Sequence, residues 1–188
     1  RKQNMRDKKV QFIVEAAAIA AIYVVLTVVF SAISFGEVQL RFSEALTILP
    51  YFTPAAIPGL FVGCLIGNLF GGAIPLDIIF GSLATLIGAC GTYALRKNKF
   101  LAPVSPIVAN TIVVPLVLFY GYGVNVPIPL QMLTVGLGEV LSCGVLGMIL
   151  LFALEKYRKK FIAHFGKAVS GISSAYHKIR QSAGNPVF

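Results

Sequence analysis

The positive charges of this chain are confined to a few places, and this confinement constrains the fold more than any other feature. Five of the sixteen Lys and Arg residues precede residue 10, three lie in a short break at residues 96–99, and seven follow residue 155. Only Arg41 lies elsewhere. The chain is 57% hydrophobic and 12% charged, against about 25% charged residues in a soluble domain. The pattern indicates an all-α integral membrane protein whose basic ends face the cytoplasm.

Six apolar segments are able to cross or partly cross a bilayer core of ~30 Å. They cover residues 10–33, two short helices within 43–70, and then 76–95, 100–120 and 129–154. The stretch 43–70 contains three prolines, which remove backbone donors, so two short helices meeting near residues 52–54 fit better than one long helix. With six crossings, both termini and the 96–99 break are cytoplasmic, as the positive-inside rule requires. We therefore predict a six-transmembrane-helix bundle with short, proline-broken second and third helices.

We expect one membrane domain over residues 1–159 and a basic cytoplasmic tail over residues 160–188. Apolar residues recur at helical spacing from Tyr157 to Ile179, with Lys and Arg elsewhere around the helix. This is typical of an amphipathic helix on the inner leaflet, although Gly166 and Gly171 also allow a partly frayed segment. Because the basic residues flank apolar segments, they indicate contact with the lipid bilayer and not with nucleic acid.

Isolated polar residues interrupt the apolar segments and are the candidate binding residues. Glu139 lies about ten residues into the last segment, where an ionisable group costs at least ~2.5 kcal/mol unless it faces a cavity or partner. We expect six such residues to converge on an outward-facing pocket, with Phe42 or Tyr120 as an aromatic wall. A lining rich in acceptors and carboxylates suits a planar ligand with several N–H donors, or a protonated amine. The six are Arg41, Glu44, Asn68, Asp77, Asn110 and Glu139.

Simpler structural interpretations remain open for several of these residues. Ser43 would cap a helix, with Arg41 paired to Glu44. Asp77 would be a carboxylate that favours a helix start, and Glu139 would be protonated and bonded to a neighbouring helix.

A strip of alanines marks the first apolar segment. Ala16 and Ala20 lie one helical turn apart, as do Ala17 and Ala21. Small residues let helices approach closely in lipid. The strip either packs within this bundle or receives another membrane subunit.

The sequence contains no recognisable catalytic motif. Gly166 and Lys167 do not form a P-loop, because Phe161 stands where the first glycine is needed. Both histidines lie in the tail, and the three cysteines share no metal-ligand spacing. We therefore predict no enzyme, no cofactor and no metal site.

Three stretches give residues 10–159 a resemblance to a known family. They are residues 38–46 (VQLRFSEAL), residues 58–60 with 67–69 (PGL and GNL), and residues 77–85 (DIIFGSLAT). With these stretches the chain resembles the substrate-binding S component of energy-coupling-factor (ECF) vitamin transporters and, more narrowly, the queuosine-precursor transporter family. The resemblance implies a multi-pass protein of the prokaryotic plasma membrane, with its site near the extracellular side under the loop that contains Gln39 and Arg41.

The resemblance also implies partners and a substrate. The partners are a membrane coupling subunit, which meets the alanine motif, and two cytoplasmic ATPases that drive uptake. The implied small-molecule substrate is a 7-deazaguanine such as preQ1 or preQ0. Three alternatives stay open: an S component for another vitamin, a self-sufficient ion-coupled secondary transporter that uses Glu139 as a proton relay, and a non-transporting membrane scaffold.

Overall fold

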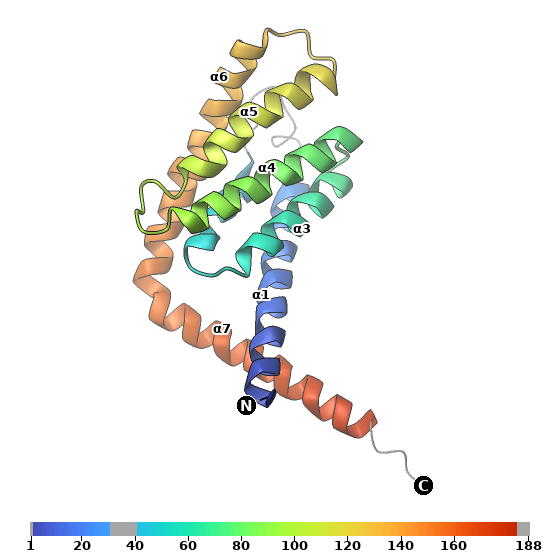
Figure 1. The fold of residues 1–188 in the computed structure, drawn as a ribbon, viewed down its shortest axis with the longest axis vertical. Coiled ribbons are helices and arrows are strands. Elements are labelled where there is room, and N and C mark those ends of the chain that lie inside the picture. Colours follow the sequence, from blue (N-terminus) through green and yellow to red (C-terminus); the bar gives the residue numbers. More distant parts are fainter. Residues whose placement is uncertain (1, 31–40, 184–188) are drawn as a thin grey trace.

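The computed structural model describes residues 2–30 and 41–183, and this part of the chain contains helices and no strand. Helices are expected because an apolar segment in lipid must satisfy every backbone N–H and C=O within itself. Figure 1 shows their arrangement as an elongated bundle. In order they are α1 (Lys2–Val29), η1 (Phe42–Tyr51), α3 (Ala56–Phe70), α4 (Pro75–Ala94), α5 (Val104–Tyr120), α6 (Ile128–Glu139), η2 (Val140–Leu146) and α7 (Gly147–Ala183).

The predicted break in the second apolar stretch is confirmed. η1 is a 3₁₀ helix that contains Pro50, and it ends where the backbone N–H groups of Phe52 and Thr53 both donate to the carbonyl of Leu49, at 2.9 and 3.1 Å. Pro54 lies in the turn before α3. The two short helices therefore meet where the prolines remove backbone donors.

Glycines on α3 allow this helix to lie directly against α1. Gly59 and Gly63 are one turn apart, and a Cβ atom at Gly59 would lie 2.7 Å from the carbonyl oxygen of Ala16. At Gly63 it would lie 2.8 Å from Cβ of Tyr23. Both distances are too short for any side chain, so the close approach of the two helices depends on glycine.

The same contact divides the alanine strip of α1 into two registers. Ala20 is buried and Ala16 is partly buried, because α3 covers them. Ala17 and Ala21 are exposed on the adjacent face of α1, about 100° further around the helix. The bundle thus uses one register for its own packing and leaves the other open.

The short helix η1 lies at the centre of the bundle, in contact with α1, α3, α4, η2 and α7. Six of its ten residues are buried, among them Glu44. Because it is enclosed by these helices, its polar side chains have to find partners on them.

Among the described residues, three helical runs are long and apolar enough to cross a membrane: Asp7–Val29, Pro75–Ala94 and Ile128–Tyr157. The apolar helices α3 and α5 are shorter. The predicted end of the first span at residue 33 lies outside the described residues, as does Gln39. The last run contains the π-helical segment η2, and α7 then continues through residue 159 to Ala183, so the predicted division into two domains stays a prediction.

Candidate functional site

All six polar residues predicted for the site are buried; five of them come from five different helices, and Arg41 directly precedes η1. Their relative exposures are at most 3%, which places them in the interior of the bundle and not on its surface. Buried polar groups are stable only when they are hydrogen-bonded or paired. The structure arranges them as two neighbouring groups. One centres on Glu44 with Asn110 and Glu139, and the other on Asp77 with Arg41 and Asn68.

The carboxylate of Glu44, in the first turn of η1, joins three other helices. The hydroxyl of Tyr23 on α1 donates to its Oε1 atom. The hydroxyl of Thr85 on α4 lies 3.3 Å from the same oxygen, and Asn110 on α5 donates from Nδ2 to Oε2 at 3.3 Å. Glu44 is therefore the point at which α1, α4, α5 and η1 meet.

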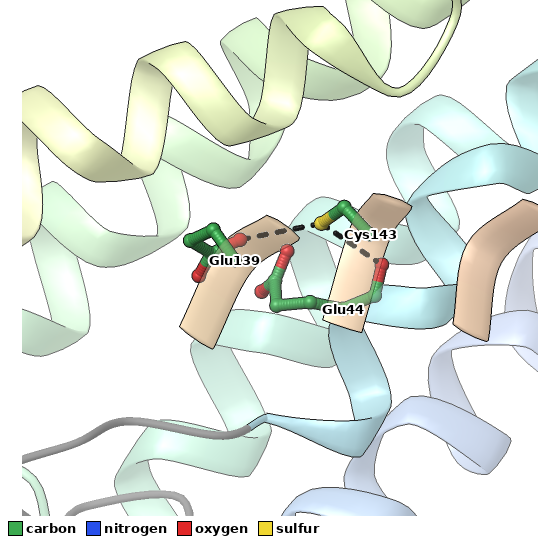
Figure 2. A group of neighbouring side chains, drawn as sticks. All are labelled: Glu44, Glu139 and Cys143. Carbon is green, nitrogen blue, oxygen red and sulfur yellow. Dashed lines mark hydrogen bonds between the residues drawn. The ribbon is translucent and has the colours of Figure 1, made fainter. Parts of the chain in front are cut away.

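A second carboxylate, that of Glu139, lies beside Glu44 (Figure 2). The thiol of Cys143 donates to Glu139 Oε2 at 3.2 Å and lies 3.5 Å from the backbone carbonyl oxygen of Glu44. Ligand atoms of the three residues all lie within 4.8 Å of one another. Two buried carboxylates at this separation repel each other, so the pair favours a positive partner, either a proton or a cationic group.

The group of Glu44, Glu139 and Cys143 is also the place where a metal ion would find ligands among the described residues. It offers three ligand atoms, one fewer than a closed zinc site, and the thiol is already engaged by Glu139. Cysteine spacings alone do not reveal this juxtaposition, and it was not predicted. The spacing of Glu139 and Cys143, one turn apart on the last helical run, was the available signal.

The second group is held by an ion pair. Nη2 of Arg41 lies 3.5 Å from Oδ2 of Asp77, and both side chains are nearly inaccessible. The hydroxyl of Tyr122 donates to the same oxygen at 3.2 Å, and Asn68 donates to the backbone carbonyl of Asp77 at 3.3 Å. Oδ1 of Asp77 is buried without a hydrogen-bond partner among the described residues, so this carboxylate retains an acceptor.

Two expectations from the sequence are wrong in detail. Arg41, and not Ser43, occupies the N-cap of η1, and the hydroxyl of Ser43 accepts a hydrogen bond from Thr27 at 2.9 Å. Tyr120 is 74% exposed and does not wall the site. Tyr122, two positions further, contacts Asp77 instead, because α5 ends at Tyr120 and the chain turns back.

Tyr23 and Thr85 also contact the site and were not among the predicted residues. Thr85 was open to detection, because Asp77, Gly81 and Thr85 follow one another at four-residue intervals on one buried face of α4. Gly81 leaves room for this face: a Cβ atom there would lie 2.8 Å from Asp77 Oδ1. Tyr23 gave no such signal, because a single tyrosine in an apolar helix is equally common at a membrane interface.

One surface groove contrasts with this polar interior. It lies between α5 and α6, has a volume of about 340 Å³, and is lined almost entirely by apolar groups such as Ile107, Leu133 and Leu137. Such a lining suits lipid chains and not a polar ligand. The polar chemistry of the molecule is therefore concentrated around η1.

Ionisable groups in the interior of an apolar helix bundle are typical of substrate and ion pathways. Together the fold and the site define a multi-pass membrane protein of the transport class, located in the cell membrane. The chain belongs to the QueT transporter family, whose family model matches residues 13–156.

A curated relative supports the same assignment. The chain is 40% identical over 85 residues to the queuosine precursor transporter QueT of Lactococcus lactis subsp. cremoris (strain MG1363). The match covers 44% of this chain and 50% of the relative, so the chain spans about half the length of the relative that it matches. No solved structure matches the chain.

Proposed function

We propose that this chain is the substrate-binding component of an importer for a queuosine precursor, a 7-deazaguanine such as preQ1 or preQ0. Membership of the QueT transporter family and the name of the Lactococcus relative support this substrate class. The single observation that carries the proposal is the buried Glu44 carboxylate, which is surrounded by donors from three helices. A guanine-like ring presents two adjacent N–H donors, and one carboxylate accepts such a pair with both oxygens.

The charges around the site favour a cationic ligand. Glu44, Glu139 and Asp77 supply up to three negative charges, and Arg41 supplies one positive charge, which is directed at Asp77. A ligand that carries an ammonium group compensates this excess, whereas a neutral ligand does not. We therefore expect preQ1, with its aminomethyl cation, to bind more tightly than preQ0, which carries an uncharged nitrile.

The proposed topology has six crossings, with both termini in the cytoplasm. The helices α1, η1, α3, α4 and α5 supply five crossings, and the run from α6 into α7 supplies the sixth. η1 spans only part of the bilayer, which is tolerated because surrounding helices enclose it. A cysteine introduced at Lys97, in the exposed break between α4 and α5, should react with an impermeant reagent from the cytoplasmic side alone.

The proposed energy source is ATP hydrolysis by partner subunits, namely an ECF membrane coupling subunit and two cytoplasmic ATPases. Ala17 and Ala21 are the available docking register on α1, since α3 covers Ala16 and Ala20. Ala17→Leu should therefore abolish uptake in cells and leave ligand binding by the purified chain unchanged. The matched control is Ala153→Leu, at an alanine that is also exposed, on α7, and it should leave both unchanged.

The experiment that tests the proposal is a thermal-unfolding titration of the purified chain with preQ1, preQ0, guanine, riboflavin, thiamine and biotin. A one-site ligand at 100 times its dissociation constant adds about 2.7 kcal/mol to the free energy of unfolding. Glu44→Gln and Glu139→Gln should remove the shift given by preQ1 while the proteins stay folded. Glu155→Gln changes a carboxylate that pairs with Lys99 outside the polar interior, and it should keep the shift.

The titration also separates the alternatives. A shift with a different vitamin would keep the S-component function and reject the queuosine precursor, and no shift with any compound would favour a scaffold. The buried pair of Glu44 and Glu139 makes a proton-coupled secondary transporter the second candidate. Accumulation of preQ1 in liposomes that contain this chain alone, driven by a proton gradient, would favour that candidate over an ATP-coupled component.

A further inference from the structure

The last part of α7 lies beyond the region shared with the family. The family match ends at residue 156, whereas the helix continues to Ala183. This extension is strongly basic, and the sequence contains no Asp or Glu after Glu155. Its positive residues are Arg158, Lys159, Lys160, Lys167, Lys178 and Arg180, and Lys156 directly precedes it.

Helical geometry gathers the apolar residues of the extension on one side. At 100° per residue, seven of them fall within an arc of about 120°. All five lysines of this part of the helix fall outside the arc, whereas Arg158 falls within it at the start of the extension. The members of this apolar arc are Tyr157, Phe161, Phe165, Val169, Ile172, Tyr176 and Ile179. Three of them have exposures that the structure describes: Tyr157 is 54% exposed, Ile172 53% and Tyr176 52%.

The position of the extension indicates what covers this apolar arc. The helix leaves the last membrane-spanning run at Tyr157, so it begins at the boundary of the bilayer. In Figure 1 it runs obliquely from the lower end of the bundle and passes the N-terminal end of α1. Lys8 and Lys9 are exposed at that end of α1 and add to the positive charge of this side.

We propose that the apolar arc of α7 lies in the headgroup region of the inner leaflet and that the lysines and arginines around it bind anionic phospholipids. The inference rests on the topology in the proposed function, which places this end of the molecule in the cytoplasm. A helix with an apolar face, a basic opposite face and a start at the membrane boundary has the chemistry of an interfacial helix. Anionic lipids attract basic segments beside a membrane span, and no acidic residue of the extension opposes them.

The natural chain contains no tryptophan, so a single introduced tryptophan reports its own environment. The full chain with Ile172→Trp is reconstituted into nanodiscs of phosphatidylcholine alone, or of phosphatidylcholine and phosphatidylglycerol in equal amounts. The matched control is Ser174→Trp, an exposed position on the opposite side of the helix from the arc. A second variant combines Ile172→Trp with Lys178→Glu and tests the charge directly.

The expected result is a blue-shifted emission and quenching by brominated acyl chains for Ile172→Trp in the anionic nanodiscs, with neither for Ser174→Trp. Lys178→Glu should reduce the quenching. Equal emission spectra for Ile172→Trp and Ser174→Trp would overturn the proposal. It would also be overturned if the blue shift and quenching of Ile172→Trp were as large in phosphatidylcholine alone as with phosphatidylglycerol present. A shift that appears only after adding RNA or the coupling subunits would also overturn it. The preQ1 thermal shift, measured on the same protein, shows independently whether the proposed function stands.

Discussion

The close contact between α1 and α3 gives a prediction that combines fold and site. Gly63→Ala places a Cβ atom 2.8 Å from Tyr23 Cβ and 3.0 Å from Ala20 Cα, where ordinary contacts are 3.4–4 Å. The two helices have to separate by several tenths of an ångström, and overpacking of this kind costs about 1–3 kcal/mol. Because Tyr23 donates to Glu44, the separation also displaces a hydrogen bond of the candidate site.

The size of the effect is isolated by a control with the same chemical change. Alanine is more favourable than glycine in a helix by about 0.5–1 kcal/mol, and this gain partly hides the steric cost. Gly144→Ala makes the same replacement of glycine by alanine in a helical segment. Its Cβ atom would lie no closer than 3.7 Å to the neighbouring atoms. The difference between the two variants therefore approximates the steric cost alone. At about 2–4 °C per kcal/mol for a chain of this length, Gly63→Ala should melt roughly 2–12 °C below Gly144→Ala.

The assay is thermal unfolding followed by far-ultraviolet circular dichroism in one detergent, with and without preQ1. Gly67→Ala provides an intermediate case, since its Cβ would lie 3.1–3.3 Å from side-chain atoms of Thr27 and not from backbone. We expect the melting temperatures to fall in the order Gly144→Ala, Gly67→Ala, Gly63→Ala. Equal melting temperatures for Gly63→Ala and Gly144→Ala would refute the reasoning, because α1 and α3 would then not touch at this position.

Two further predictions concern the site and the cytoplasmic surface. Gly81→Ala should weaken preQ1 binding more than it lowers the melting temperature, because its Cβ would lie 2.8 Å from Asp77 Oδ1 and 3.2 Å from Asn68 Nδ2; a titration showing unchanged affinity would contradict this. The hydrogen bond from Lys99 to Glu155, at 2.6 Å, raises the pKa of the Lys99 ammonium above its ordinary value of 10.5. A raised pKa means that the pair stabilises the fold below pH 10.5 and loses this effect as the pH rises further. The difference in melting temperature between the natural chain and Lys99→Gln should therefore be constant from about pH 7 to 9 and disappear in strong alkali.

Burial of the site residues was predictable because the cost of a lone polar group in lipid is large. The positions of Glu44, Asp77 and Glu139 in apolar stretches required interior partners, and the structure places all three inside. The break at Pro50 and Pro54 was predictable for a similar reason, since proline cannot donate to a helix. These features follow from local chemistry, which a sequence displays directly.

The identity of the partners was not predictable, because it depends on how each helix is rotated about its own axis. Arg41 pairs with Asp77, thirty-six positions away, across an interface that no local pattern specifies. Tyr122 and not Tyr120 reaches this pair, a difference of two residues that is set by where α5 ends. The four-residue spacing of glycines on α3 predicts a close contact with another helix, but it does not identify α1 as that helix.

The π-helical segment η2 determines how α7 is rotated about the helix axis relative to Glu139 on α6. It begins directly after Glu139, and its i to i+5 hydrogen bonds accommodate one residue more than α-helical turns would over the same length. Removing one residue between Val140 and Leu146 would restore α-helical winding and rotate everything downstream by about 100° relative to Glu139. A relative with a shorter segment here would therefore have to shift the apolar pattern of its tail by one position to keep the same face towards the membrane.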